Sequence, residues 1–115
     1  MKYLLLIHQN EAAMLAAGQE AAARRFSAYA AYTEAMTKAG AYLGGQRLRQ
    51  STTASTVRVR EGKTEVLDGP YAETKEQLGG YYLIDVPDLD AALSWAARCP
   101  GAQYGAVEVR PIWEM

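Results

Sequence analysis

Runs of apolar residues predict strands at both ends of the chain and near its middle. Residues 3–7 form an unbroken apolar run, which is typical of a strand covered on both faces, and residues 81–86 form a second, largely apolar strand. Within residues 106–112 two valines alternate with Glu108 and Arg110, as in a strand with one buried face.

A strict alternation of valine and arginine at residues 56–60 predicts a further strand, with valines on one face and arginines on the other. Residues 61–63 have the composition of a hairpin turn, and residues 64–67 are expected to pair back. Residues 41–50 predict a weak strand interrupted by glycines.

Two segments have the pattern of helices. Residues 20–39 are rich in Ala, Glu and Met, contain neither Pro nor Gly, and are followed by Gly40, which favours a helix end there. One face of this helix is expected to hold Phe26, Tyr29, Ala30, Thr33 and Met36. Asp88 can cap a second, amphipathic helix over residues 89–98, which Pro100 ends.

Residues 68–80 are the unusual part of the chain. They open with the turn-forming residues Asp68, Gly69 and Pro70 and close with two glycines. Thr74 and Gln77 have the spacing of a capping box, which predicts one helical turn. Near the start of the chain, residues 9–18 are expected to form a loop with a short helical turn.

The order of these elements is β-α-β-β-α-β with an added hairpin strand, the ferredoxin-like arrangement of the α+β class. The 115 residues make one domain. Helices would cover one face of the sheet, so the other face is expected to pack against the sheet of a second copy, which predicts a homodimer.

Composition excludes several classes of protein. Half of the chain is hydrophobic and the net charge is -1, so we expect a globular protein that does not bind nucleic acid directly. No apolar run approaches the length of a membrane span, and the first apolar run is too short for a signal sequence. We therefore expect a cytoplasmic protein that does not associate with a membrane. A lone, inert Cys99 and the lack of metal-ligand or phosphate-loop spacings predict no metal and no cofactor.

Residues 68–76, followed by residues 78–81, resemble the signature of the YCII-related, DGPF-type family. The likeness continues in residues 2–7 and 107–112 and in the second predicted helix, so it covers nearly the whole chain. One departure is Tyr71, where the family usually has Phe.

The resemblance implies a ferredoxin-like fold in which two chains pair into a dimeric α/β barrel, with a cavity between sheet and helices in each subunit. It also implies a link with sigma-factor systems for the DGPF branch, and a His–Asp pair in the members that are suspected enzymes. This chain has no histidine in its first predicted helix, and residues 99–101 stand where the motif with that Asp would fall.

The candidate catalytic residues are His8, the only histidine, and Asp68. Imidazole takes up and releases protons near neutral pH, so His8 can act as a general base, or it can simply form a hydrogen bond at a strand end. Asp68 can belong to the site or can stabilise its own turn. Glu73 and Lys75, in the signature loop, are expected to face one cavity together with His8.

Arg58, Tyr71 and Tyr82 complete the candidate ligand-binding residues. Arg58 can clamp an anionic ligand, although a strand arginine more often forms part of a solvated face. Tyr81 and Tyr82 alternate, so one should face the core or cavity and the other the dimer interface.

Three functions are compatible with these residues. The first is a regulatory homodimer that binds a small-molecule ligand, and the alternative is a lyase-type or isomerase-type enzyme that uses His8 and the signature loop. A purely structural dimer is the third, and it leaves the signature loop unexplained.

Overall fold

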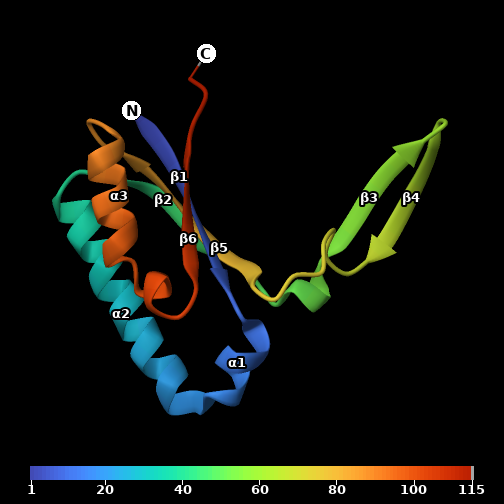
Figure 1. The fold of residues 1–115 in the computed structure, drawn as a ribbon, viewed down its shortest axis with the longest axis horizontal. Coiled ribbons are helices and arrows are strands. Elements are labelled where there is room, and N and C mark those ends of the chain that lie inside the picture. The colour runs from blue at the N-terminus through green and yellow to red at the C-terminus, as the bar shows by residue number, and fades with distance from the viewer. Residues whose placement is uncertain (115) are drawn as a thin grey trace.

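Four antiparallel strands form the central sheet, in the order β2-β5-β1-β6. This arrangement is seen in a computed structural model that describes residues 1–114 (Figure 1). The strands span Lys2–Gln9 (β1), Tyr42–Arg47 (β2), Gln77–Asp85 (β5) and Ala106–Pro111 (β6). The unbroken apolar run of β1 has a physical reason, because β1 lies between two neighbouring strands in the middle of the sheet.

Helices lie on one side of this sheet (Figure 1). They span Glu11–Ala16 (α1), Gly18–Lys38 (α2) and Leu89–Arg98 (α3), with short 3-10 turns at Ser51–Thr53 (η1) and Pro100–Gln103 (η2). The carboxylate of Asp88 accepts a hydrogen bond from the Ala91 amide at 2.9 Å, so the predicted cap of α3 is confirmed. None of these helices is long and apolar enough to cross a membrane, among the residues described.

The core lies between the sheet and α2 and α3. Tyr3, Leu5 and Ile84 point from alternate strand positions into it, against Met36 of α2. The predicted inner face of α2 was partly wrong: Phe26 is 71% exposed, because the buried residues of this helix lie in its C-terminal half. Tyr32 occupies that buried half instead.

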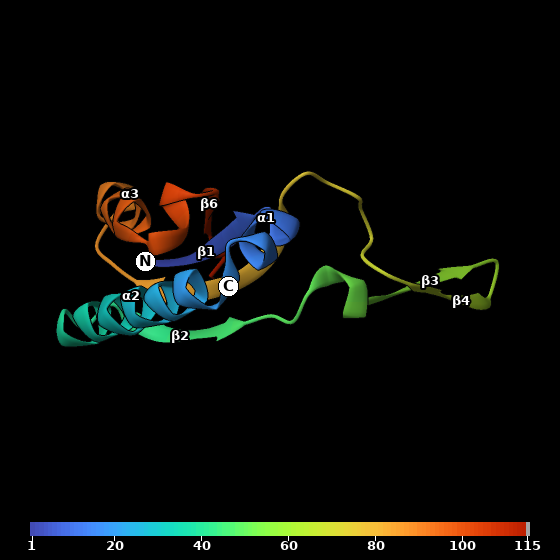
Figure 2. The same ribbon diagram turned by 90° about the horizontal axis from the view of Figure 1, so that it is seen from below.

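An arm formed by β3 (Ser55–Arg60) and β4 (Lys63–Asp68) extends from the sheet on the side away from the helices (Figures 1 and 2). The predicted hairpin is confirmed, and Glu61 and Gly62 both have positive φ at its turn. These two strands pair only with each other. We call residues 55–68 the arm.

Residues 69–76 connect the arm back to β5 without a helix, so the predicted helical turn was wrong. The Thr74 hydroxyl donates to the Glu76 carbonyl, and Gln77 Nε2 donates to the Thr74 carbonyl at 2.6 Å. Both side chains therefore stabilise a tight turn just before β5, in place of the capping box.

The predicted α+β class is confirmed, with antiparallel sheets and helices. A single chain does not close a barrel within residues 1–114, because the main sheet has free edges at β2 and β6.

Candidate functional site

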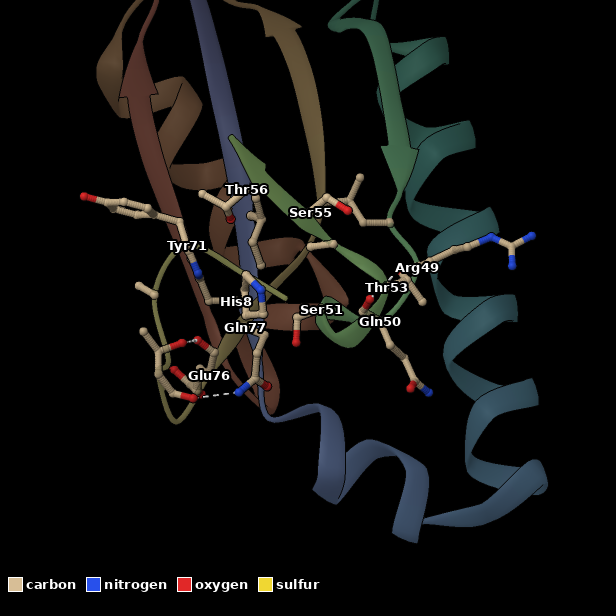
Figure 3. A pocket seen from close by; sticks show the side chains of 16 residues that line it. His8, Arg49, Gln50, Ser51, Thr53, Ser55, Thr56, Tyr71, Glu76 and Gln77 are labelled. Carbon is tan, nitrogen blue, oxygen red and sulfur yellow. Dashed lines mark hydrogen bonds between the residues drawn. The ribbon is translucent and has the colours of Figure 1, made fainter. Parts of the chain in front are cut away.

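A pocket of about 640 Å³ lies at the base of the arm (Figure 3). It is lined by His8 at the end of β1, by side chains of residues 48–56 between β2 and β3, and by side chains of residues 70–78 between β4 and β5. The two linkers that carry the arm thus supply most of its wall, and the main sheet supplies the histidine.

A relay of hydrogen bonds fixes these linkers to the first helix. Asn10 accepts a hydrogen bond from the Ala13 amide at 2.9 Å and so caps α1, which leaves Glu11 in the first turn. The Glu11 carboxylate accepts bonds from the amide and the hydroxyl of Ser51, both at 2.7 Å. The Glu11 amide donates to Gln77 Oε1 at 3.0 Å, so η1, α1 and β5 are joined.

His8 lies beside a carboxylate that comes from the neighbouring strand. In the antiparallel pairing of β1 with β6, Leu6 is opposite Glu108 and His8 is opposite Ala106, so His8 and Glu108 are diagonal neighbours on one face. His8 Nε2 is 3.5 Å from Glu108 Oε1. The ring is 31% exposed, yet Nε2 itself is buried and has no hydrogen-bond partner within residues 1–114.

Glu108 also lies 3.5 Å from Arg110 Nε, through its other carboxylate oxygen. The carboxylate is therefore placed between a permanent cation and the imidazole. A carboxylate beside an imidazole can orient the ring, and such a pair can take part in proton transfer. The sequence pattern put Glu108 on the polar face of its strand, but only the strand register brings it to His8.

Of the predicted site residues, His8 and Tyr71 line the pocket. Glu73 and Lys75 are exposed and are not part of its lining, whereas their neighbours Thr74 and Glu76 are. The role of this loop in a functional site stays a prediction, and the loop residues that line the pocket include Thr74 and Glu76.

Arg58 and Asp68 lie on the arm and do not line the pocket. The Arg58 guanidinium lies over the Tyr71 ring, 5.0 Å from its centre, so Arg58 holds a residue that does line it. The turn after β4 is held by the Gly69 amide, which donates to the Ala54 carbonyl at 2.6 Å.

Tyr82 lies in the core, on the face of the sheet that carries the helices. Its hydroxyl is 2.9 Å from the Thr33 hydroxyl, and burial raises the pKa of the phenol. Cys99 is buried as well, and burial raises the pKa of its thiol, an effect that a backbone hydrogen bond from Gly101 partly offsets. A thiol kept protonated in this way is a poor nucleophile.

Metal ligands do not gather anywhere in the described part of the chain: no three His, Cys, Asp or Glu side chains lie close enough together to hold an ion.

Comparison with known proteins finds similarity over almost the whole chain. A family model described as the YCII-related domain matches residues 1–115. Uncharacterized protein R00369 of Rhizobium meliloti (strain 1021) is 40% identical over 114 residues, which covers 97% of this chain and 92% of that protein.

Proposed function

The chain belongs to the YCII-related domain family, and from that premise we propose that it acts as a homodimer that binds a small molecule in the pocket at the base of the arm. The observation that carries this proposal is the pocket itself. Its volume of about 640 Å³ lies within the range of ligand sites, roughly 300–1,000 Å³. It combines apolar walls such as Leu48 and Leu78 with the only histidine of the chain.

The surface opposite the helices supports the dimer. Leu4 and Leu6 of β1 and Leu83 of β5 lie on this open face, and each is only partly buried. A second sheet packed on this face would remove these leucines from water and would complete the ferredoxin-like barrel that the family resemblance implies. His8 lies on the same face, so the second copy would also lie close to the pocket.

In this proposal the protein binds its ligand without transforming it, and its role is regulatory. A ligand that favours one arrangement of the arm linkers would shift the protein toward that arrangement, and a transcription partner of the sigma-factor type could recognise it. The relay from Glu11 to Ser51 joins pocket wall and helix, which gives such a shift a route into the main body.

One observation favours a second function, an enzyme that uses acid–base chemistry. His8 Nε2 and Glu108 Oε1 are 3.5 Å apart, and a histidine oriented by a carboxylate is a frequent general base. This pair differs from the His–Asp pair of the family's suspected enzymes, because both of its members lie on strands.

Screening of thermal stability against carboxylates, phosphates and neutral hydroxylated compounds tests the first proposal, with the variant His8→Gln as control. A compound that binds should raise the melting temperature of the wild type, and the rise should be smaller for His8→Gln. If Glu108→Gln keeps binding while turnover of a bound compound is lost, the protein is an enzyme. If compounds stabilise wild type and His8→Gln equally, the ligand site is elsewhere.

A further inference from the structure

The arm has two faces of different chemistry. Cross-strand register puts Val57 opposite Val66 and Val59 opposite Thr64 on one face, which we call the valine face. The only charged side chain on that face is Asp68, at the base of the arm. The other face carries Arg58 opposite Glu65 and Arg60 opposite Lys63.

Nothing in the described chain covers the valine face. Val57, Val59 and Val66 are 59%, 68% and 62% exposed, although strand alternation of this kind ordinarily marks a buried face. An isolated two-stranded hairpin is at best marginally stable in water. The arm therefore lacks the packing partner that its sequence pattern indicates.

The dimensions of the chain lead to the same conclusion. Its radius of gyration is 16.0 Å, whereas a compact domain of this length has one of roughly 13 Å. The arm points away from the main sheet (Figures 1 and 2), so the valine face does not pack on its own body.

We infer that the valine face packs against a second copy of this chain, so that each arm grips the other subunit of the dimer. This inference rests on the homodimer proposed above. It adds a second contact to the packing of the open sheet faces, and it makes the pocket at the arm's base sensitive to the presence of the partner.

The area needed for a stable dimer supports a second copy as the occupant. Four strands at about 4.8 Å spacing and about 20–25 Å long present roughly 400–500 Å² of projected area, about half of the ~800 Å² per partner of a standard interface. One arm face adds roughly 200 Å², and in a symmetric dimer each copy both gives and receives an arm. One arm given and one received therefore nearly double the area that the sheet alone brings to the contact.

Sedimentation equilibrium of a triple variant, Val57→Thr, Val59→Thr and Val66→Thr, tests the inference. Threonine keeps the branched shape and the strand preference, and the three positions are exposed, so the monomer should fold normally. We expect the dimer dissociation constant to rise at least about tenfold, because both arms lose apolar contact.

The matched control replaces the opposite face, with Arg60→Thr, Glu65→Thr and Leu67→Thr, and should change the dissociation constant less than about threefold, because surface residues away from a contact contribute little. As a direct readout, Val59→p-benzoylphenylalanine is irradiated in a mixture of ¹⁴N-labelled and ¹⁵N-labelled chains. Mass spectrometry should find cross-links that join light and heavy peptides.

The outcomes separate the two proposals. If the wild type is dimeric, the valine variant dimerises equally well and Val59 cross-links only within its own chain, the arm inference is overturned and the dimer stands. If the wild type sediments as a monomer of 12.6 kDa at micromolar concentration, both the dimer and the arm contact are overturned.

Discussion

Glu11 binds Ser51 through both of its carboxylate oxygens, one to the amide and one to the hydroxyl, each at 2.7 Å. Forty residues separate the two along the chain, so this contact fixes the base of the arm to the first helix. The pocket wall formed by residues 48–56 depends on it.

Replacing Glu11 by Ala should therefore loosen the pocket wall. Loss of two charge-assisted hydrogen bonds on partly buried groups should cost about 1–3 kcal/mol of unfolding free energy. Urea unfolding measures the loss of unfolding free energy, and the Ser51 amide proton should exchange with solvent faster than in the wild type. Glu11→Gln keeps one side-chain oxygen that can accept a hydrogen bond, so it should lose less unfolding free energy than Glu11→Ala. An unchanged Ser51 exchange rate in Glu11→Ala would show that the contact does not hold the linker.

The turn at residues 68–70 is expected to matter for architecture more than for chemistry. Gly69 has φ of +103°, a conformation that other residues resist, and a Cβ atom placed there would meet nothing within 4 Å. Gly69→Val should thus cost about 1–3 kcal/mol from backbone strain alone. Glu73→Ala, on an exposed side chain, should change stability by less than about 0.5 kcal/mol.

Thermal melts of the two variants decide this order. The turn would instead have to contact the ligand if Gly69→Val melts like the wild type and at the same time loses binding. The prediction of an architectural turn would then be wrong.

Stability should fall in alkaline solution. Burial raises the pKa of Cys99 above its ordinary 9.0 and those of Tyr29, Tyr32 and Tyr82 above their ordinary 10.0. Above pH 9 the unfolded chain therefore releases protons that the folded chain keeps, and the unfolding free energy decreases as pH rises. Well below pH 9 these groups are protonated in both states and contribute no slope.

Urea midpoints between pH 7.5 and 10.5 check this prediction. Cys99→Ala should be less stable at every pH because it leaves a small cavity, but it should lose less additional stability between pH 9 and 10. A stability that is flat across this range in the wild type would contradict the burial of these groups.

Local patterns of the sequence predicted most of the elements. The alanine-rich run without Gly or Pro predicted α2, and Asp88 predicted the start of α3, because both signals act within a few residues. The alternation of valine and arginine at residues 56–60 and the turn residues 61–63 predicted the hairpin in the same way. The segment 68–80 was harder, because Thr74 and Gln77 stabilise a tight turn as readily as a helix cap.

Contacts between distant segments could not be predicted in the same way. Glu108 reaches His8 only through the register of β1 with β6, which a pattern of alternation does not specify. The exposure of Phe26 follows from where α2 meets the sheet, and its composition does not reveal that. The isolation of the arm likewise depends on which strands it fails to pair with.

NMR of His8 tests most directly whether a small molecule binds in the pocket at the base of the arm. Since His8 is the only histidine, the carbon-bound protons of its imidazole give a single, assignable set of NMR signals. Each compound that raises the melting temperature would be titrated at constant pH into wild type and into Tyr71→Ala, which removes another wall of the pocket. We expect the His8 signals to shift to saturation in the wild type, and the same compound to bind more weakly to Tyr71→Ala. The proposal is contradicted if stabilising compounds saturate the protein while the His8 signals stay in place.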